Sequence, residues 1–385
     1  MLRWYATSYY YKTSAWPDRL VALLPSELRS RAEKELRRRR LDELDDRLVR
    51  RAWETEFLER PIGRFISRDI MRRLQAGRHA RFPARLLRLF EREPVEVIWG
   101  PQDCVEAFEK LKKHGVVCIL DQAVGHFASL DRVLREEHER HPDFFGADQV
   151  GISGKALDRQ RRATEVADLI VVGSEFAAQT MIDNSVDPRK LRIVPYGYDE
   201  RRFPTEQPRR QPLNGRPTEF LFVGLVGARK GAAYMLEAFR GIDARRARLT
   251  LVGPLDLPSE TFARYARDVN YVGSVTRAEV LDHMRRADCL ILPSLFEGSA
   301  LVLLEALAMG LPIIQTASSG LGAQEGVNGI VLKEVSADHV RSAAESVIAC
   351  MERTRNWGDA SWQMRADRTW ANYRSAVRDL VQSVT

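Results

Sequence analysis

The chain has 385 residues, which is more than one hydrophobic core usually organises, so we expect two domains. Hydrophobic residues make up 44% and charged residues 29% of the sequence, which is typical of a globular protein and excludes a disordered or collagen-like chain. No apolar run reaches the roughly 18–20 residues that span a bilayer, and the opening residues show no secretory signal. We therefore expect a cytoplasmic protein.

The positive charge is concentrated in one part of the chain. The formal net charge is +7, and residues 29–92 alone hold 20 Arg or Lys against 11 Asp or Glu. Such a segment is either a solvated charged face or a face that lies on the anionic inner surface of the cell membrane. The four cysteines are scattered without a CxxC pair, which favours reduced thiols over disulfides or a metal site.

The first half of the sequence changes character near residue 95. An aromatic stretch at 2–11 suits a strand, and helical patterns follow at 27–60 and 65–91, the second divided or kinked by Pro83. Short apolar runs then alternate with helical patterns, which indicates βαβ units and a parallel sheet. The expected strands are 95–100, 115–120, 167–174 and 191–197, and the expected helices are 103–114, 128–142, 158–166 and 175–184.

A polar stretch with four prolines at 204–217 reads as an interdomain linker. A second alternation follows it and predicts a complete doubly wound domain. The expected strands include 218–224, 248–254, 270–274, 288–294, 312–317 and 329–333, and the expected helices include 231–240, 259–267, 277–287, 299–309 and 336–353. The tail at 361–382 is predicted to be one further amphipathic helix.

Two carboxylates mark the loop after the strand 288–294. Ligands in open α/β sheets bind beyond the carboxyl ends of strands, and Glu297 lies on such a loop. A helix that opens near Ser299 would present the N–H groups of Ser299, Ala300 and Leu301, which suits phosphate. Glu305 follows one to two turns later, within reach of ribose hydroxyls. The alternative is a capping loop with a solvated glutamate.

A second motif lies on the turn after the strand 218–224. Gly224 and Gly227 permit close backbone approach, and Arg229 and Lys230 follow immediately. Two cations at a βα turn suit a pyrophosphate group. The glycine spacing alone is a weak signal, and an ordinary tight turn with solvated charges is the alternative.

Together these motifs resemble family 4 of the retaining glycosyltransferases, within the glycosyl transferases group 1. The resemblance is carried by the E-x7-E pair Glu297/Glu305, the VG…KG turn and the block LPSLFEGSALVLLEALAMGLPII. It extends to GVNGIVL at 326–332, to VVGSEFAAQTMIDNSVDPRKLRIVPYGYDERRFP at 171–204, where Tyr196 replaces a common Asn, and to DQAVGH at 121–126. It implies an α/β protein of GT-B architecture, with two doubly wound Rossmann-like parallel-sheet domains that face a cleft.

The resemblance also implies domain limits and site roles. Residues 1–205 would bind the acceptor, 206–360 would bind the donor, and 361–385 would pack back on the first domain. Glu297 would contact donor sugar hydroxyls, Glu305 the ribose, and Lys230 with Arg229 the diphosphate. The remaining expected site residues are His126 near the transferred sugar, Gly224 and Gly227 on the turn, Ser299, Ala300 and Leu301 at the distal phosphate, and Val275 beside the base.

The sequence departs from the family pattern in two places. Leu225 stands where an Arg often follows the turn glycine, and Arg229 is the candidate replacement. The usual first strand with its Gly-rich loop has no counterpart here, so the first domain is expected to lack its first βα unit. That expectation predicts a gap or a displaced strand order in the first sheet.

The implied activity is retaining, metal-independent hexosyl transfer from a UDP- or GDP-sugar to a glycan or lipid-linked acceptor, as in polysaccharide biosynthesis. No cofactor is implied. The alternative is a catalytically impaired GT-B scaffold that binds nucleotide sugar without efficient transfer. A phosphorylase-like enzyme would need a pyridoxal lysine with a supporting motif, and nucleic-acid binding would need interleaved aromatics in the basic segment; the sequence offers neither.

Overall fold

The computed structural model describes residues 2–3, 5–7, 22, 25–27, 29–30, 33, 44–51, 82–146, 150–209 and 215–385. These residues form two compact units, 1–118 and 119–385, and the division falls within strand β4. Most of the basic segment at 29–92 lies outside the described residues, as does most of the helical pattern predicted at 65–91. The predicted domain boundaries near 205 and 360 stay predictions.

The first part of the chain contributes two parallel sheets. Strands β1 (Tyr5–Thr7) and β2 (Val49–Arg51) pair with each other. A second sheet has the order β3-β4-β5-β6, which follows the chain, so the described strands show no displaced order. Its strands are β3 (Val97–Gly100), β4 (Val117–Gln122), β5 (Leu169–Val172) and β6 (Leu191–Ile193).

Helices alternate with these strands as the apolar pattern predicts. Ser153 and Ser174 cap α6 and α7 by accepting backbone N–H bonds, which explains where both helices begin. Residues 82–92 are also helical. The named helices of this part are α4 (Val105–Leu111), α5 (Phe127–Arg140), α6 (Gly154–Val166) and α7 (Glu175–Ile182).

The second part of the chain forms a six-stranded parallel sheet of order β11-β9-β7-β12-β13-β14. Its central strands are short apolar runs buried on both faces, as expected where helices cover a parallel sheet on both sides. These strands are β7 (Thr218–Val223), β9 (Ala247–Val252), β11 (Asn270–Gly273), β12 (Cys289–Leu292), β13 (Ile313–Thr316) and β14 (Gly329–Leu332). The short strands β8 (Val226–Gly227) and β10 (Leu255–Asp256) pair beside it.

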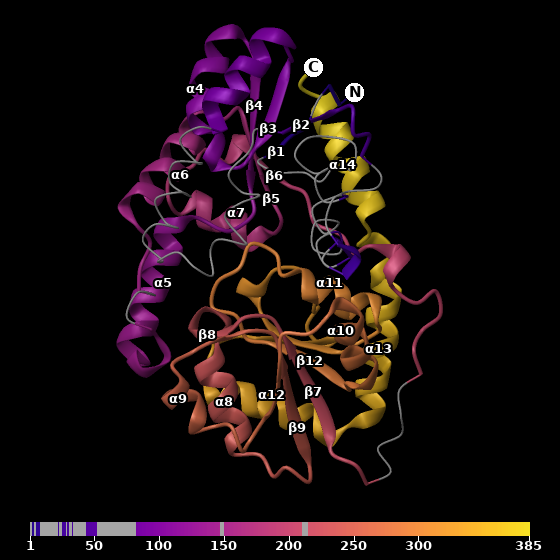
Figure 1. The fold of residues 1–385 in the computed structure, drawn as a ribbon. Helices are drawn as coiled ribbons and strands as arrows, with labels where there is room; N and C mark the ends of the chain where they lie inside the picture. Colours follow the sequence, from indigo (N-terminus) through magenta and orange to yellow (C-terminus); the bar gives the residue numbers. More distant parts are fainter. Residues whose placement is uncertain are drawn as a thin grey trace. The chain divides into compact units, whose positions relative to one another are not determined.

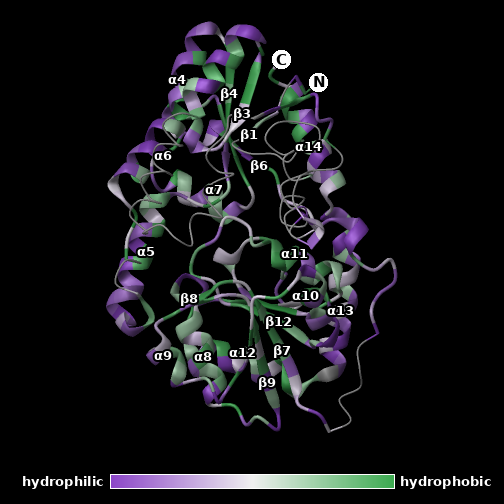
Figure 2. Cartoon of the chain, viewed as in Figure 1, coloured by the Kyte–Doolittle hydropathy of each residue, from purple (hydrophilic) through white to green (hydrophobic). Residues whose placement is uncertain are grey.

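Helices cover both faces of this sheet, and the expected doubly wound arrangement is confirmed. Helix α8 packs on α12, and α11 packs on α13; the two pairs lie on opposite sides of the strands in Figure 1. Figure 2 shows β12 and its neighbours as largely hydrophobic, with mixed colours on the helices. The helices are α8 (Ala232–Arg240), α9 (Ser259–Ala263), α10 (Arg277–Arg286), α11 (Leu301–Ala308), α12 (Ala337–Ala349), α13 (Met351–Met364) and α14 (Trp370–Gln382).

The strand order reverses between two neighbours in this sheet. From β7 the chain proceeds outward to β9 and β11, and from β12 it proceeds the other way to β13 and β14. Connections that leave in opposite directions leave a crevice beyond the carboxyl ends of the two strands where they part. The loops after β7 and β12 therefore meet at this point, and they are the loops that carry the two predicted motifs.

The prediction of one helix over 361–382 is wrong. Helix α13 already begins at Met351 and ends at Met364, and α14 begins at Trp370 after a short 3-10 turn. The backbone leaves the helical conformation at Arg368 and Thr369, because Thr369 is extended and forms a parallel bridge with Tyr198. The Arg365 guanidinium donates to the carbonyls of Pro204 and Ala308 just before this break. Thr369 then caps the new helix.

Candidate nucleotide-sugar site

The turn after β7 is fixed against the loop after β12. Gly231 has φ +71°, and a Cβ there would lie 2.1 Å from the Pro293 carbonyl oxygen, so only glycine fits. The N–H of Leu295 donates to the Arg229 carbonyl over 2.9 Å. This close approach places the side chains of Arg229 and Lys230 beside the β12 loop.

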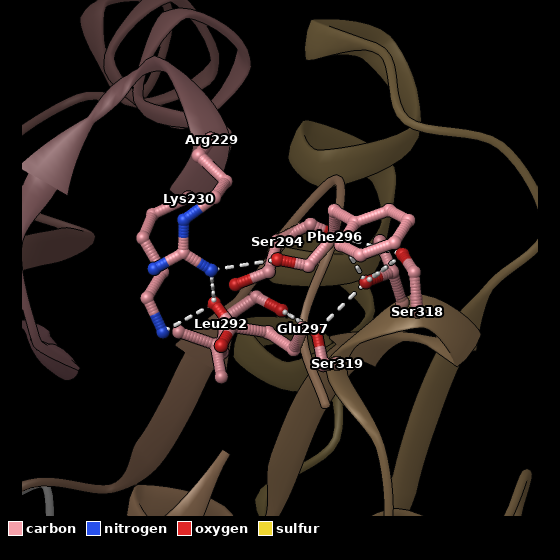
Figure 3. A network of polar contacts seen from close by, with 9 residues as sticks. Arg229, Lys230, Leu292, Ser294, Phe296, Glu297, Ser318 and Ser319 are labelled. Atoms are coloured by element: carbon pink, nitrogen blue, oxygen red, sulfur yellow. Dashed lines mark hydrogen bonds and ion pairs between the residues drawn. The ribbon is translucent and has the colours of Figure 1, made fainter. Parts of the chain in front are cut away.

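Both cations meet the carboxylate of Glu297 (Figure 3). The distance from Glu297 Oε1 is 2.7 Å to Arg229 Nη1 and 2.5 Å to Lys230 Nζ. Arg229 also donates to the Phe296 carbonyl over 2.7 Å. Burial lowers the pKa of Lys230, while the Glu297 carboxylate acts in the opposite direction and favours the charged ammonium. The sequence predicted these three side chains separately, and the fold brings them together.

A group of hydroxyls holds the β12 loop in place from the end of β13. Thr316 and Ser318 both donate to the Ser294 carbonyl, over 2.6 and 2.8 Å. Ser319 donates to the Leu292 carbonyl over 2.9 Å. These bonds, drawn in Figure 3, satisfy carbonyls that the sheet leaves unpaired. The loop that carries Glu297 is therefore anchored on both sides.

Helix α11 begins two residues later than predicted, and one of its expected N–H groups is already used. Ala300 is the N-cap, and its N–H donates to the Ser319 carbonyl over 3.1 Å. The prediction that Ala300 presents its N–H to a phosphate is therefore wrong. Within the described chain the N–H groups of Ser299 and Leu301 have no backbone acceptor, and the buried Ser299 hydroxyl has no partner. These groups can receive an anion.

Glu305 lies on α11 and pairs with a residue that the sequence analysis missed. Arg277, the first residue of α10, donates to the Glu305 carboxylate over 2.6 Å. Burial raises the pKa of Glu305, and the Arg277 guanidinium partly offsets that effect. Thr276 and Glu279 form a capping box that marks the start of α10 beside the predicted base position at Val275, but this local pattern does not report the pairing with Glu305.

Comparison with known proteins relates this arrangement to a family. The family model described as "Glycosyl transferases group 1" matches residues 217–352. Over these residues the chain is similar to the glycosyl transferases group 1. The segment holds Arg229, Lys230, Glu297 and Glu305 in one continuous match.

Relatives and solved structures extend the likeness beyond this segment. A D-inositol 3-phosphate glycosyltransferase of Geodermatophilus obscurus is 28% identical over 243 residues, which are 56% of this chain and 54% of that protein. An MMP alpha-(1->4)-mannosyltransferase of Mycolicibacterium hassiacum is 26% identical over 240 residues, 57% of this chain and 56% of that protein. This chain therefore spans about half the length of these curated relatives.

The structure of Anabaena HepE in complex with UDP aligns with a TM-score of 0.60 at 13% identity, covering 78% of this chain and 82% of that one. At that identity the likeness concerns the fold. The expected GT-B fold, with its parallel α/β sheets, is confirmed.

The two glycines of the turn after β7 have different surroundings. Gly224 has φ +151°, and Lys230 Cε lies 3.8 Å from the place of a Cβ. Gly227 is extended and packs on Asp256, its partner in the β8–β10 ladder. The space beside Gly227, which was predicted to admit a ligand close to the backbone, is thus occupied by Asp256. Val275 is partly buried against the domain's apolar core.

His126 has a structural role at the start of α5. Its ring Nδ1 accepts from the Ala128 N–H over 3.2 Å. The backbone N–H of His126 donates to Thr180 Oγ1 over 2.9 Å. Burial lowers the pKa of His126, which favours the neutral ring, and because Nδ1 accepts a hydrogen bond the proton of that neutral ring lies on Nε2. The cap explains this histidine in the unliganded protein, and its contact with a transferred sugar stays a prediction.

The described residues contain neither a group of metal ligands nor a membrane-spanning helix. No group of three His, Cys, Asp or Glu side chains in them is arranged to hold a metal ion. No helix among them combines the length and hydrophobicity needed to cross a bilayer.

Proposed function

We propose that this protein transfers a hexose from a nucleoside diphosphate sugar to a glycan or lipid-linked acceptor. The observation that carries the proposal is the carboxylate of Glu297 bridging two cations, Arg229 and Lys230, at the point where the strand order reverses. A partly buried cation pair beside a helix start is suited to a diphosphate. The group 1 match over the same residues supports the reading.

Donor binding would rearrange the ion pairs. The diphosphate oxygens would take over Lys230 and Arg229, and the N–H groups of Ser299 and Leu301 would bind the distal phosphate. Glu297, released from part of its cation contacts, would accept hydrogen bonds from donor sugar hydroxyls. Glu305 keeps one oxygen on Arg277 and would offer the other to the ribose.

The chemistry follows from charge that develops as the sugar leaves. The bond between the anomeric carbon and the phosphate oxygen breaks, and a bond to the acceptor oxygen forms on the same face of the sugar. The acceptor proton passes to the departing phosphate oxygen, so we assign no protein base. Lys230 and Arg229 meet the charge that grows on that phosphate, which is where fixed cations accelerate a reaction most. We propose a retaining reaction that needs no metal ion.

The donor proposal can be tested by ligand-induced stabilisation followed by a transfer assay. A ligand that binds only the native state raises the melting temperature, so UDP, GDP and their glucose, mannose and galactose conjugates are compared at equal concentration. We expect one nucleotide series to stabilise the protein. No stabilisation by any of them would refute the proposal. Binding without sugar consumption, with methyl glycosides as acceptors, would instead support an impaired scaffold, which the comparisons do not favour.

Retention has its own measurement. The coupling constant of the anomeric proton in the product, read by NMR during turnover, reports the configuration first formed. Activity that is unchanged in the presence of EDTA is expected if the cations alone carry the leaving charge. Loss of activity with EDTA, restored by a divalent metal, would show that a metal takes part.

A further inference from the structure

Three aromatic side chains gather beyond the carboxyl end of β6. The ring of Tyr196 lies 6.2 Å from that of Trp370 and 5.7 Å from that of Tyr373, between centroids. Trp370 and Tyr373 meet edge to face at 5.1 Å. Tyr196 follows β6 by three residues, and the other two rings come from the first turn of α14.

Backbone contacts fix these rings relative to each other. The Tyr198 N–H donates to the Arg368 carbonyl over 2.9 Å, and the Trp370 N–H donates to the Tyr198 carbonyl over 3.1 Å. Gly197 allows this approach, because a Cβ there would lie 2.1 Å from the Thr369 carbonyl carbon. The cluster is therefore rigidly placed.

A carboxylate acts electrostatically on two members of the cluster. Asp121 is the last residue but one of β4, at the carboxyl end of that strand. Burial is the first cause that raises the pKa of both tyrosines, to about 12 for Tyr373, and the negative charge of Asp121 adds to it in both cases. The same carboxylate therefore influences both phenols.

The hydrogen-bond donors of the cluster have no protein acceptor. Among the described residues, no acceptor is found for the phenol groups of Tyr196 and Tyr373 or for the indole N–H of Trp370. By contrast, the phenol of the buried Tyr234 donates to Glu137 over 2.8 Å. The three side chains of the cluster are partly exposed, and none of their donor atoms is enclosed by protein without a partner. Their donors are therefore open to a polar ligand that also contacts the rings.

The cluster adjoins the donor loop. At Gly173, directly after β5, the place of a Cβ lies 2.9 Å from Ser299 Cβ and 3.1 Å from Tyr196 Cε2. Ser299 follows Glu297 by two residues. The Tyr196 ring thus reaches from the donor loop toward α14, and a ligand on these rings would lie beside the donor sugar.

We propose that Tyr196, Trp370, Tyr373 and Asp121 form the subsite for the acceptor sugar. Aromatic surfaces with a few oriented polar groups bind ligands that have both apolar and polar faces, and a pyranose ring is such a ligand. The C–H face of the sugar packs on the rings, the phenols and the indole donate to its hydroxyls, and Asp121 accepts from a hydroxyl. This inference rests on the proposed transferase function, because it assigns the acceptor side of the same site.

Saturation-transfer NMR tests the subsite with defined probes. Methyl α-glucoside, α-mannoside and α-galactoside are added to the protein saturated with UDP or GDP, whichever stabilises it. The variants are Tyr196→Phe and Tyr373→Phe, which remove one hydroxyl each and keep the ring. Tyr198→Phe is the matched control, because it changes a neighbouring tyrosine whose ring packs on Phe203.

We expect a signal for at least one glycoside with the wild type and the control. Each test variant should bind it about three- to tenfold more weakly, as for one lost hydrogen bond, with nucleotide affinity unchanged. No signal in the wild type, or equal signals in all four proteins, would overturn the subsite. If a test variant has a lower melting temperature but binds the glycoside as the wild type does, the subsite is also overturned. The rings would then serve only to pack α14 against the segment that carries Tyr196.

The two proposals fail separately. Absence of nucleotide binding refutes the donor proposal. In that case the glycoside experiment is repeated without nucleotide on the same four proteins, and its result decides whether the subsite exists.

Discussion

Replacing Glu305 by Gln should stabilise the unliganded protein at neutral pH. The carboxylate is mostly buried, and burial raises its pKa above the value of 4.5 for an exposed glutamate, even with Arg277 beside it. Between 4.5 and the folded-state pKa the native state therefore binds more protons than the unfolded state. The free energy of unfolding must fall as pH rises through that window, and the whole penalty is present above it.

The size of the gain follows from the surroundings of the pair. Arg277 is half exposed, so it remains solvated when its partner loses its charge. Removing the buried charge should then raise the free energy of unfolding by about 1 kcal/mol at pH 7.5. The gain should shrink toward pH 4.5, where the wild-type carboxyl takes up its proton.

The same substitution should weaken nucleotide binding. A carboxylate that accepts from ribose hydroxyls contributes about 1.5–3 kcal/mol per charged hydrogen bond, or roughly 10- to 150-fold in affinity. Thermal melting from pH 4.5 to 8 and calorimetric titration with UDP and GDP measure the two effects. Glu345→Gln is the matched control, because it breaks a surface pair with Arg246 and should change stability by less than about 1 kcal/mol.

If Glu305→Gln is more stable than the wild type but binds nucleotide more weakly, the buried carboxylate serves ligand binding at a cost in stability. If Glu305→Gln melts below the wild type at pH 7.5 without nucleotide, the buried-charge argument is refuted. If it binds both nucleotides as the wild type does, the ribose assignment is refuted.

Three further predictions concern other parts of the chain. Lys230→Ala should lower kcat about 100-fold or more in a steady-state transfer assay, with a smaller effect on donor KM. A higher donor KM with unchanged kcat would show a binding role only. Gly298→Ala should lower the free energy of unfolding by roughly 3 kcal/mol in urea, because its Cβ would lie 1.8 Å from the Ala123 carbonyl oxygen. Gly154→Ala, with open space at its Cβ, should change little, and similar midpoints for both variants would contradict the packing argument. The basic segment at 29–92 should make the protein sediment with anionic liposomes at low salt and not at high salt, because each well-placed cation contributes about 1 kcal/mol of attraction to the surface. Failure to sediment at low salt would exclude membrane binding through this segment.

Local patterns in the sequence determined the strands and helices of residues 217–352 and their order. Runs such as Cys289–Leu292 are too short and too apolar for surface helices, and the turn residues between them set the alternation. The carboxyl ends of parallel strands lie on one edge of a sheet, so Lys230 and Glu297 were expected on the same edge. The order of strands along the sequence was sufficient for this prediction, because the rule depends on which strand each residue follows and not on side-chain contacts.

Only the tertiary structure decided which groups of the site are already paired. The Ala300 N–H was expected to be available, but it bonds the Ser319 carbonyl, which comes from the next strand end. Arg277 was missed because 28 residues separate it from Glu305, and no local pattern reports that distance.

The tail shows the same limit. Its amphipathic pattern predicted one helix, whereas the backbone at Arg368–Trp370 pairs with Tyr198 from a distant segment and the helix breaks there. The aromatic cluster also depends on this break, because α14 restarts where Trp370 and Tyr373 can reach Tyr196. Periodicity describes one element at a time, whereas hydrogen bonds and ring contacts between distant segments depend on how those elements pack.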